Sequence, residues 1–233
     1  MQDIAIFRDE LRSLDGDLFL CHLFTPEHQR TDMLTLYSIY ADSARIPFIV
    51  SEPMLGAIRY QWWREVIDGK HVDTAPVSGF LNASNLPQNL LHKLIDAREG
   101  LFDKEQPSLS DIELSARDIG VPFMKTALSV LSENTKDDLP DGLLDAAGSG
   151  FELLRLSTAY PNEIQEDIIV AARTKLQKAA DLFNGMSRKQ RKALLPVFLI
   201  IGLSKRHVQN IDKGRSLFFY QLQLLKMAFT GKL

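Results

Sequence analysis

Three aspartates in the run DDLPD at 137–141 have a spacing that could bind a divalent metal ion. Their carboxylate oxygens are the kind of ligand that Mg²⁺ prefers. A metal site would need Asp137, Asp138 and Asp141 on one face of a continuous helix, and Pro140 disfavours a helix at this point. The surrounding residues favour a turn, after which Asp141 is expected to cap the next helix. We therefore predict no metal site and no cofactor, and keep these three aspartates as the alternative magnesium ligands.

Arginines within apolar segments are a second group that could do chemistry. A guanidinium group forms paired hydrogen bonds with phosphate oxygens without needing a metal. Arg45 and Arg155 stand amid apolar helical residues, where an unpaired charge would be costly to bury. Arg59 and Arg64 follow in the next predicted helix. The alternative for Arg64 is a surface ion pair with Asp68, four residues later. We expect Arg45, Arg59 and Arg155 to bind a phosphate group or another anion.

Aromatic residues at helical spacing accompany these arginines. Tyr37 and Tyr40 precede Arg45, while Trp62 and Trp63 follow Arg59. They have two interpretations: they line a cavity for the apolar part of a ligand, or they pack in an ordinary core.

The stretch 31–68 must position these side chains, and it predicts two consecutive apolar helices. Apolar residues recur in it at spacings of three and four, the period of a buried helical face. Pro47 should end or kink the first helix, whereas Pro53 suits the first turn of the second. Leu55 and Ile58 are expected to face inward together with the two tryptophans.

Helical periodicity continues along the rest of the chain, and no convincing strand or repeat interrupts it. Ser110 and Glu113 form a predicted capping box, and 69–86 is the clearest loop. Gly148 and Gly150 lie within a helical pattern, which indicates close helix packing or a kink. These observations predict an all-α fold in one domain spanning 1–233. The further predicted helices are 3–14, 87–102, 110–131, one from about 141, 164–183, 187–208 and 217–229.

Composition excludes several classes of protein. The net charge of −3 shows no bias toward nucleic acid, and the single Cys21 fits a reducing compartment. The N-terminus lacks the pattern of a secretory or transit signal. The most apolar run, Leu194–Leu203, is shorter than the ~20 residues that span a bilayer. We therefore expect a cytoplasmic protein.

A basic run precedes that apolar segment and consists of Arg188, Lys189, Arg191 and Lys192. It could rest on anionic lipid headgroups or meet a partner protein. The alternative is a solvated helix start, although cations there oppose the helix dipole and so favour an anionic neighbour.

Several short segments resemble the squalene/phytoene synthase family: LYSI at 36–39, SEPMLG at 51–56, Arg59 and QWWRE at 61–65. The resemblance implies the α-helical isoprenoid (terpenoid) synthase fold with a central cavity. Active members carry a magnesium-binding D-D-x-x-D run about seven residues after the tyrosine. Its positions correspond here to Ala44, Arg45 and Phe48.

The second acidic cluster of active members is missing as well. It follows an arginine–aspartate pair, of which this chain has Arg155 but carries Leu156 in place of the aspartate. In lacking both motifs the chain is similar to the complex I assembly factor-like branch of the family.

That resemblance implies a catalytically degenerate protein that acts as an assembly or maturation factor for the respiratory NADH dehydrogenase. Its partners would be complex I subunits, with a possible peripheral contact on the inner membrane. Two alternatives stay open. One is a magnesium-dependent prenyl-diphosphate transferase with an atypical metal site, and the other is a non-catalytic protein that binds an isoprenoid or another lipid.

Overall fold

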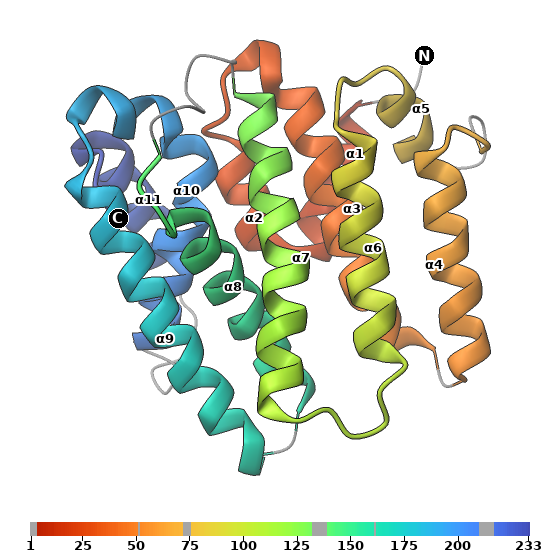
Figure 1. The fold of residues 1–233 in the computed structure, drawn as a ribbon. Helices are drawn as coiled ribbons and strands as arrows, with labels where there is room; N and C mark the ends of the chain where they lie inside the picture. Colours follow the sequence, from red (N-terminus) through yellow and green to blue (C-terminus); the bar gives the residue numbers. More distant parts are fainter. Residues whose placement is uncertain (1–3, 51, 72–75, 132–138, 161, 210–216) are drawn as a thin grey trace.

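The computed structural model describes residues 4–50, 52–71, 76–131, 139–160, 162–209 and 217–233. These residues form helices joined by short connectors, and none of them is in a strand, which confirms the all-α fold class (Figure 1). The α helices are α1 (Ile4–Leu14), α2 (Gly16–His22), α3 (Arg30–Ile49), α4 (Pro53–Ile67), α5 (Pro76–Asn82), α6 (Gln88–Phe102), α7 (Leu109–Val130), α8 (Leu143–Leu156), α9 (Asn162–Gly185), α10 (Arg188–Gln209) and α11 (Leu217–Thr230).

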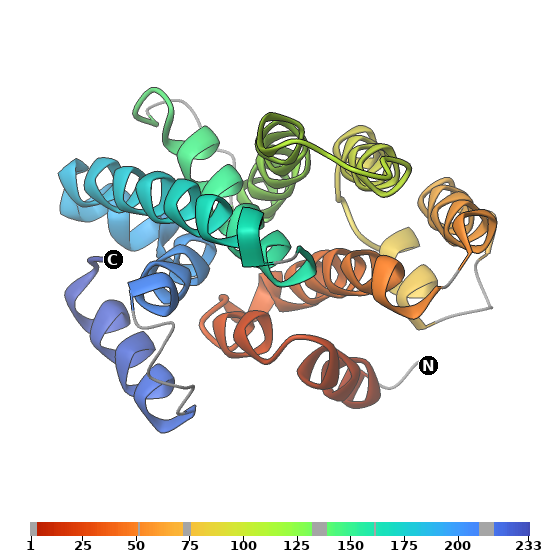
Figure 2. The same ribbon diagram turned by 90° about the horizontal axis from the view of Figure 1, so that it is seen from below.

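The helices α4, α6, α7, α8 and α9 pack one against the next in chain order (Figure 1). Seen from below, α3 lies across from this row, on the side of α1 and α2 (Figure 2). Residues 33–41 of α3 are all buried, so this helix is surrounded by its neighbours rather than half exposed. The helix that contains the positions of the family's first metal-binding run therefore lies at the centre of the protein.

Glycines allow α7 and α8 to approach very closely. A Cβ atom on Gly148 would lie 2.4 Å from the carbonyl carbon of Gly120, and one on Gly120 would lie 2.1 Å from the carbonyl oxygen of Gly148. Gly150 contacts α9 in the same way, at Leu176. These contacts confirm close helix packing as the interpretation of the two glycines in α8.

Pro47 does not end its helix, because α3 continues to Ile49. The proline falls in the last turn, where the loss of one backbone hydrogen bond interrupts little of the helix. Pro53 stands at the start of α4, as predicted.

The prediction that Leu55 and Ile58 face inward is wrong, since their side chains are 45% and 58% exposed. The buried stripe of α4 runs instead through Gly56, Tyr60 and Trp63. Gly56 lies against the Phe102 ring on α6, and this contact fixes the rotation of α4 about its axis.

Two local predictions also need correction. The segment 69–86 includes helix α5, in which Val77 and Leu81 are buried one turn apart. The capping box of α7 is formed by Ser108 and Asp111, two residues earlier than expected. Among the residues that the structure describes, no helix is long and apolar enough to cross a lipid bilayer.

Candidate functional site

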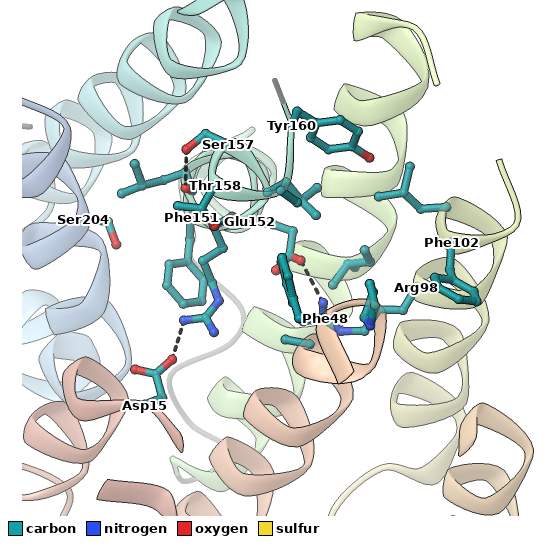
Figure 3. Close-up of a pocket in the computed structure, with 18 of the residues that line it drawn as sticks. Asp15, Phe48, Arg98, Phe102, Phe151, Glu152, Ser157, Thr158, Tyr160 and Ser204 are labelled. Atoms are coloured by element: carbon teal, nitrogen blue, oxygen red, sulfur yellow. Dashed lines mark hydrogen bonds and ion pairs between the residues drawn. The ribbon is translucent and has the colours of Figure 1, made fainter. Parts of the chain in front are cut away.

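A cavity of about 900 Å³ lies between α2, the end of α3, α6, α7 and α8 (Figure 3). Apolar side chains such as Leu101, Phe102 and Ile119 form much of its wall. Phe48, at the end of α3, also lines the cavity while being 62% exposed, so the cavity extends to the protein surface. Its volume lies within the ~300–1,000 Å³ typical of small-molecule sites.

Two ion pairs cross this cavity, one of them fully buried and the other partly buried. Arg98 on α6 donates a hydrogen bond from Nη1 to Oε1 of Glu152 on α8 at 3.0 Å, and the two side chains are 6% and 1% exposed. Arg155, one turn after Glu152, donates to the carboxylate of Asp15 at the start of α2. Figure 3 shows Arg98 reaching toward Glu152 from one side of the cavity and Asp15 lying on another.

Tyr40 on α3 joins the two pairs. Its hydroxyl donates to the second carboxylate oxygen of Glu152. The Arg98 guanidinium carbon lies 4.6 Å from the centroid of the Tyr40 ring, and that of Arg155 lies 5.2 Å from it. Two cations therefore lie near the ring, at distances typical of cation–π contacts.

Local sequence explains why these charged groups are inside. Arg98 follows Leu91, Leu94 and Ile95 at helical spacing, so it stands on the buried face of α6. Asp15 caps α2, with Oδ1 accepting a hydrogen bond from the Leu18 amide at 2.9 Å. The positions of Arg98 and Asp15 are therefore set by their helices and do not depend on a bound ligand.

The surroundings shift the pKa values of the groups around the cavity. Burial raises the pKa of Tyr40 well above its usual range, and the Glu152 carboxylate adds to this effect. Burial opposes the charge of Arg155, but Asp15 and the other acidic groups nearby raise its pKa above the ordinary value. Burial also raises the pKa of Tyr60, on the cavity wall, to about 12. The tyrosines are therefore neutral hydrogen-bond donors at pH 7, and Arg155 is charged.

Three polar atoms at the cavity have no hydrogen-bond partner among the described residues. They are Nε and Nη2 of Arg98 and the hydroxyl of Tyr60. Both side chains line the cavity and both residues are buried. A buried donor without a partner destabilises a protein by roughly 1–3 kcal/mol. All three atoms are buried, with almost no surface accessible from the cavity in this structure.

The residues that the sequence singled out do not form one site. Arg155 lines the large cavity, whereas Arg45, Trp62 and Trp63 line a separate one of about 400 Å³ near α1. Arg45 is also exposed and lies 3.9 Å from Asp42.

The other predicted pocket residues lie elsewhere. Tyr37 is buried against Phe123. Tyr40 does not line the large cavity itself, but it is hydrogen-bonded to Glu152, which does. Arg59 is exposed on α4, and Arg64 pairs with Asp96 and Glu99 of α6 rather than with Asp68.

The positions that correspond to the family's first aspartate-rich run carry no oxygen ligand for a magnesium ion. Of these positions, Ala44 and Phe48 line the large cavity with carbon atoms, and Arg45 is exposed beside Asp42. The carboxylates of Asp15 and Glu152 are each paired with an arginine. A hard cation needs several oxygen ligands, and these positions do not supply them.

The alternative metal ligands fall mostly outside the described part of the chain, which leaves out Asp137 and Asp138. Asp141 is exposed, and Gly142 rather than Asp141 is the N-cap of α8, with a positive φ of 76°. Within the ranges that the structure describes, no three His, Cys, Asp or Glu side chains are grouped so as to hold a metal ion.

The basic run at the start of α10 is divided between two environments. Arg188, Lys189 and Lys192 are exposed. Arg191 turns inward and donates to the backbone carbonyls of Asn184, Met186 and Gly231. Arg191 therefore ties the end of α9 to the end of α11, and three cations of the run remain for an external contact.

Sequence reasoning missed Arg98 and Glu152. The signal for Arg98 was present, because a charge on the apolar stripe of a helix must have a buried partner. Glu152 likewise interrupts the apolar residues of α8. That the two residues pair, 54 positions apart, is visible only in the fold.

Known proteins resemble this chain in sequence and in structure. Complex I assembly factor 6 of NADH dehydrogenase (ubiquinone) is 28% identical in Bos taurus and 26% identical in Homo sapiens, in each case over 129 residues. These matches include 52% of this chain but only 39% of each relative, so the chain spans well under two thirds of their length.

Two solved structures share the fold. A dehydrosqualene synthase superimposes with a TM-score of 0.64 at 15% identity, covering 97% of this chain and 95% of the other. A squalene synthase from Alicyclobacillus acidocaldarius gives a TM-score of 0.57 at 14% identity, covering 97% and 93%. These matches confirm the expected isoprenoid synthase fold. The family model for squalene/phytoene synthase matches residues 11–170, and the chain therefore belongs to the squalene/phytoene synthase family.

Proposed function

We propose that this protein is a non-catalytic member of its family that acts in the assembly or maturation of the respiratory NADH dehydrogenase. The relatives named as complex I assembly factors support the role, although they match over only part of their length. The observation that carries the proposal is the mutual pairing of the cavity charges, Arg98 with Glu152 and Arg155 with Asp15.

The chemistry of the family explains why this pairing matters. A diphosphate leaves only when metal ions or free cations offset its charge. Here Ala44, Arg45 and Phe48 replace the expected metal ligands, and the cavity arginines already neutralise carboxylates. The proposal therefore includes no cofactor, and complex I subunits are the proposed partners.

A peripheral membrane contact is part of the proposal, and the surface favours a place other than the basic run for it. Five exposed apolar side chains stand at the end of α3 and the start of α4, which only residues 50–52 separate. We call this group the α3–α4 corner. Exposed apolar groups of this kind mark interaction sites. Its members are Phe48, Ile49, Met54, Leu55 and Ile58.

The charge beside the corner favours an anionic bilayer as its neighbour. Arg45 and Arg59 are exposed on the same two helices. Apolar side chains that enter the headgroup region and arginines that meet anionic lipids act together, with each cation near the surface contributing about 1 kcal/mol. Because Phe48 belongs both to the corner and to the cavity wall, the cavity would face the membrane surface.

The test is performed in cells that lack this protein. The wild-type chain should restore the amount of assembled NADH dehydrogenase and should co-purify subunits of that complex. As a matched comparison, the purified protein is incubated with farnesyl diphosphate and Mg²⁺, and diphosphate release is measured. A normal amount of assembled NADH dehydrogenase in the deletion cells would overturn the proposed role. Diphosphate release by the purified chain would also overturn the proposal, and it would favour the prenyl-diphosphate transferase.

A further inference from the structure

The smaller cavity, of about 400 Å³, lies where α1, α4 and α5 pack against α3. Trp62 and Trp63 both line it, with ring centroids 5.0 Å apart and ring planes inclined at 71°. Phe7 and Val77, which are buried, add further apolar surface. The volume falls within the ~300–1,000 Å³ of small-molecule sites. The cavity therefore offers an apolar, aromatic wall to a small ligand.

Charged groups of both signs also line this cavity. They are Glu10 on α1 and Asp42 and Arg45 on α3. Arg45 and Asp42 lie 3.9 Å apart, at the outer limit of an ion pair, and their side chains are 47% and 37% exposed. An exposed pair of this kind contributes only about 0–1 kcal/mol. The Arg45 guanidinium and the Asp42 carboxylate therefore keep most of their hydrogen-bonding capacity for a ligand.

Asp42 is the less exposed of the two acids. Burial is the largest influence on its carboxyl group and raises its pKa. Arg45, a hydrogen bond from the Trp63 side chain and Arg59 lower the pKa without cancelling that effect. A further positive charge beside this carboxylate is therefore favourable. Glu10 supplies a second carboxylate to the same cavity, and the indole rings add attraction for a cation.

The cavity borders the α3–α4 corner on both of its helices. Arg45 precedes Ile49 by four residues on α3, and Trp62 follows Ile58 by four residues on α4. Four residues are about one helical turn, which advances a helix by about 5 Å. The apolar face of an interfacial element enters ~5–10 Å into the boundary between headgroups and acyl chains. A cavity one turn behind the corner would therefore lie at the level of the lipid headgroups.

We propose that the smaller cavity binds the headgroup of a phospholipid whose phosphate carries a primary ammonium group, as in phosphatidylethanolamine. The ammonium group, which has three N–H donors, donates to the carboxylates of Asp42 and Glu10 beside the Trp62 ring. Arg45 donates to the phosphate. A headgroup with both charges provides a counter-charge for the arginine and for the acids at once. The inference rests on the proposed membrane contact and names the lipid that this contact recognises.

The two tryptophans make the test selective, because the chain has no others and both line this cavity. Their fluorescence is followed while the full chain is titrated with dihexanoyl lipids below the concentration at which these form micelles. Dihexanoyl phosphatidylethanolamine should give a saturable change. Phosphatidylglycerol, which lacks an ammonium group, and phosphatidylcholine, whose ammonium group has no N–H, are compared with the same acyl chains. Each should bind at least about tenfold more weakly, the effect of roughly one charge-assisted hydrogen bond.

Four variants assign the partners of the headgroup. Asp42→Asn and Glu10→Gln should each weaken the binding of phosphatidylethanolamine by about tenfold without weakening that of phosphatidylglycerol, since only the ammonium loses a partner. Arg45→Gln should weaken the binding of both lipids. Asp9→Asn is the matched control, because this exposed acid is next to Glu10 in α1 and does not line the cavity. Its affinity for phosphatidylethanolamine should equal that of the wild type.

Each contrary outcome has a definite meaning. Equal affinity for the three lipids would show an apolar cavity without headgroup recognition, and tighter binding of phosphatidylglycerol would show an anion site. Unchanged affinity for phosphatidylethanolamine in both Asp42→Asn and Glu10→Gln would remove these carboxylates from the site. Each of these results, and likewise the failure of phosphatidylethanolamine to bind to folded wild-type protein, would overturn the inference.

Failure of the membrane contact itself has a different outcome, because the dihexanoyl lipids are tested without a bilayer. The protein would then not float with vesicles that contain anionic lipid, while monomeric phosphatidylethanolamine would still change the tryptophan fluorescence. That result would support the headgroup site and overturn only the contact of the α3–α4 corner with the bilayer.

Discussion

Arg98 and Glu152 form an ion pair at 3.0 Å in which both side chains are more than nine-tenths buried. The Tyr40 hydroxyl donates to the same carboxylate. Breaking such a pair leaves a charge in the interior without a partner, which typically destabilises a protein by about 3–5 kcal/mol.

We therefore predict that Arg98→Met and Glu152→Met each lower the free energy of unfolding by about 3–5 kcal/mol. The double variant should be more stable than either single variant, because neither charge is then stranded. Urea unfolding at pH 7 measures all four proteins of the cycle. Simple addition of the two single effects would contradict the pairing.

The contact between Gly120 and Gly148 makes a second prediction. Gly148→Ala should destabilise the fold by about 3 kcal/mol or more, because the added methyl group would meet the backbone of α7, which has little room to move. Gly100→Ala is the control: it is exposed in α6 and has open space around it. That change should be neutral or stabilise by up to about 1 kcal/mol. Similar melting temperatures for the two variants would disprove the close contact.

His22 gives the protein a predicted pH dependence. It is 4% exposed and its Nδ1 atom lacks a partner among the described residues. Burial lowers its pKa to about 4, with the Arg30 and Arg8 charges adding to the effect. The unfolded chain binds the same proton near pH 6.5. The stability linked to His22 is therefore complete above pH 6.5 and is lost as the pH falls toward 4.

Unfolding measured between pH 7 and pH 4.5 tests this dependence. Between these limits the wild type should lose on the order of 2–3 kcal/mol through His22 alone. His22→Gln should lose correspondingly less over the same range, whereas a substitution of the exposed His28 should leave the wild-type profile unchanged. Parallel profiles for wild type and His22→Gln would show that this histidine is not the titrating group.

The α3–α4 corner predicts where the protein meets lipid. Met54→Asp combined with Ile58→Asp should abolish co-flotation with vesicles that contain anionic lipid, since the apolar contact is lost and two like charges are added. Leu114→Asp, at an exposed apolar position on α7, should float like the wild type. Loss of flotation on neutralising Arg188 and Lys189 instead, with the double aspartate variant unaffected, would move the contact to the basic run.

Most of the fold followed from periodicity and from prolines and glycines. The predicted helix at 87–102 agrees closely with α6 at Gln88–Phe102, and that at 217–229 with α11 at Leu217–Thr230. The sequence did not identify the correct capping residue where two candidates lie within a few residues of each other. Ser108 rather than Ser110 caps α7, because both serines stand within one turn of an acid.

The site was less predictable, since it depends on how the helices are rotated. One of the two interpretations of Trp62 and Trp63 placed them beside a ligand cavity, but in the fold they line the smaller cavity next to α1. The packing of Gly56 on Phe102 sets that rotation, and no feature of a single helix encodes it. Arg155 was singled out from its apolar surroundings, whereas its partner Asp15 lies 140 positions away in the sequence and was not predicted.

The mutual pairing of the four charged groups at the large cavity has a consequence for the history of this cavity. An aspartate introduced at Ala44 would add a carboxylate to a cavity wall in which Arg98 and Arg155 are already paired with Glu152 and Asp15. A metal site could arise only if several acids and a cation appeared together, since each intermediate would be destabilised. Single substitutions would therefore not restore a metal site in this cavity, and the paired arrangement would persist even where a metal ion is abundant.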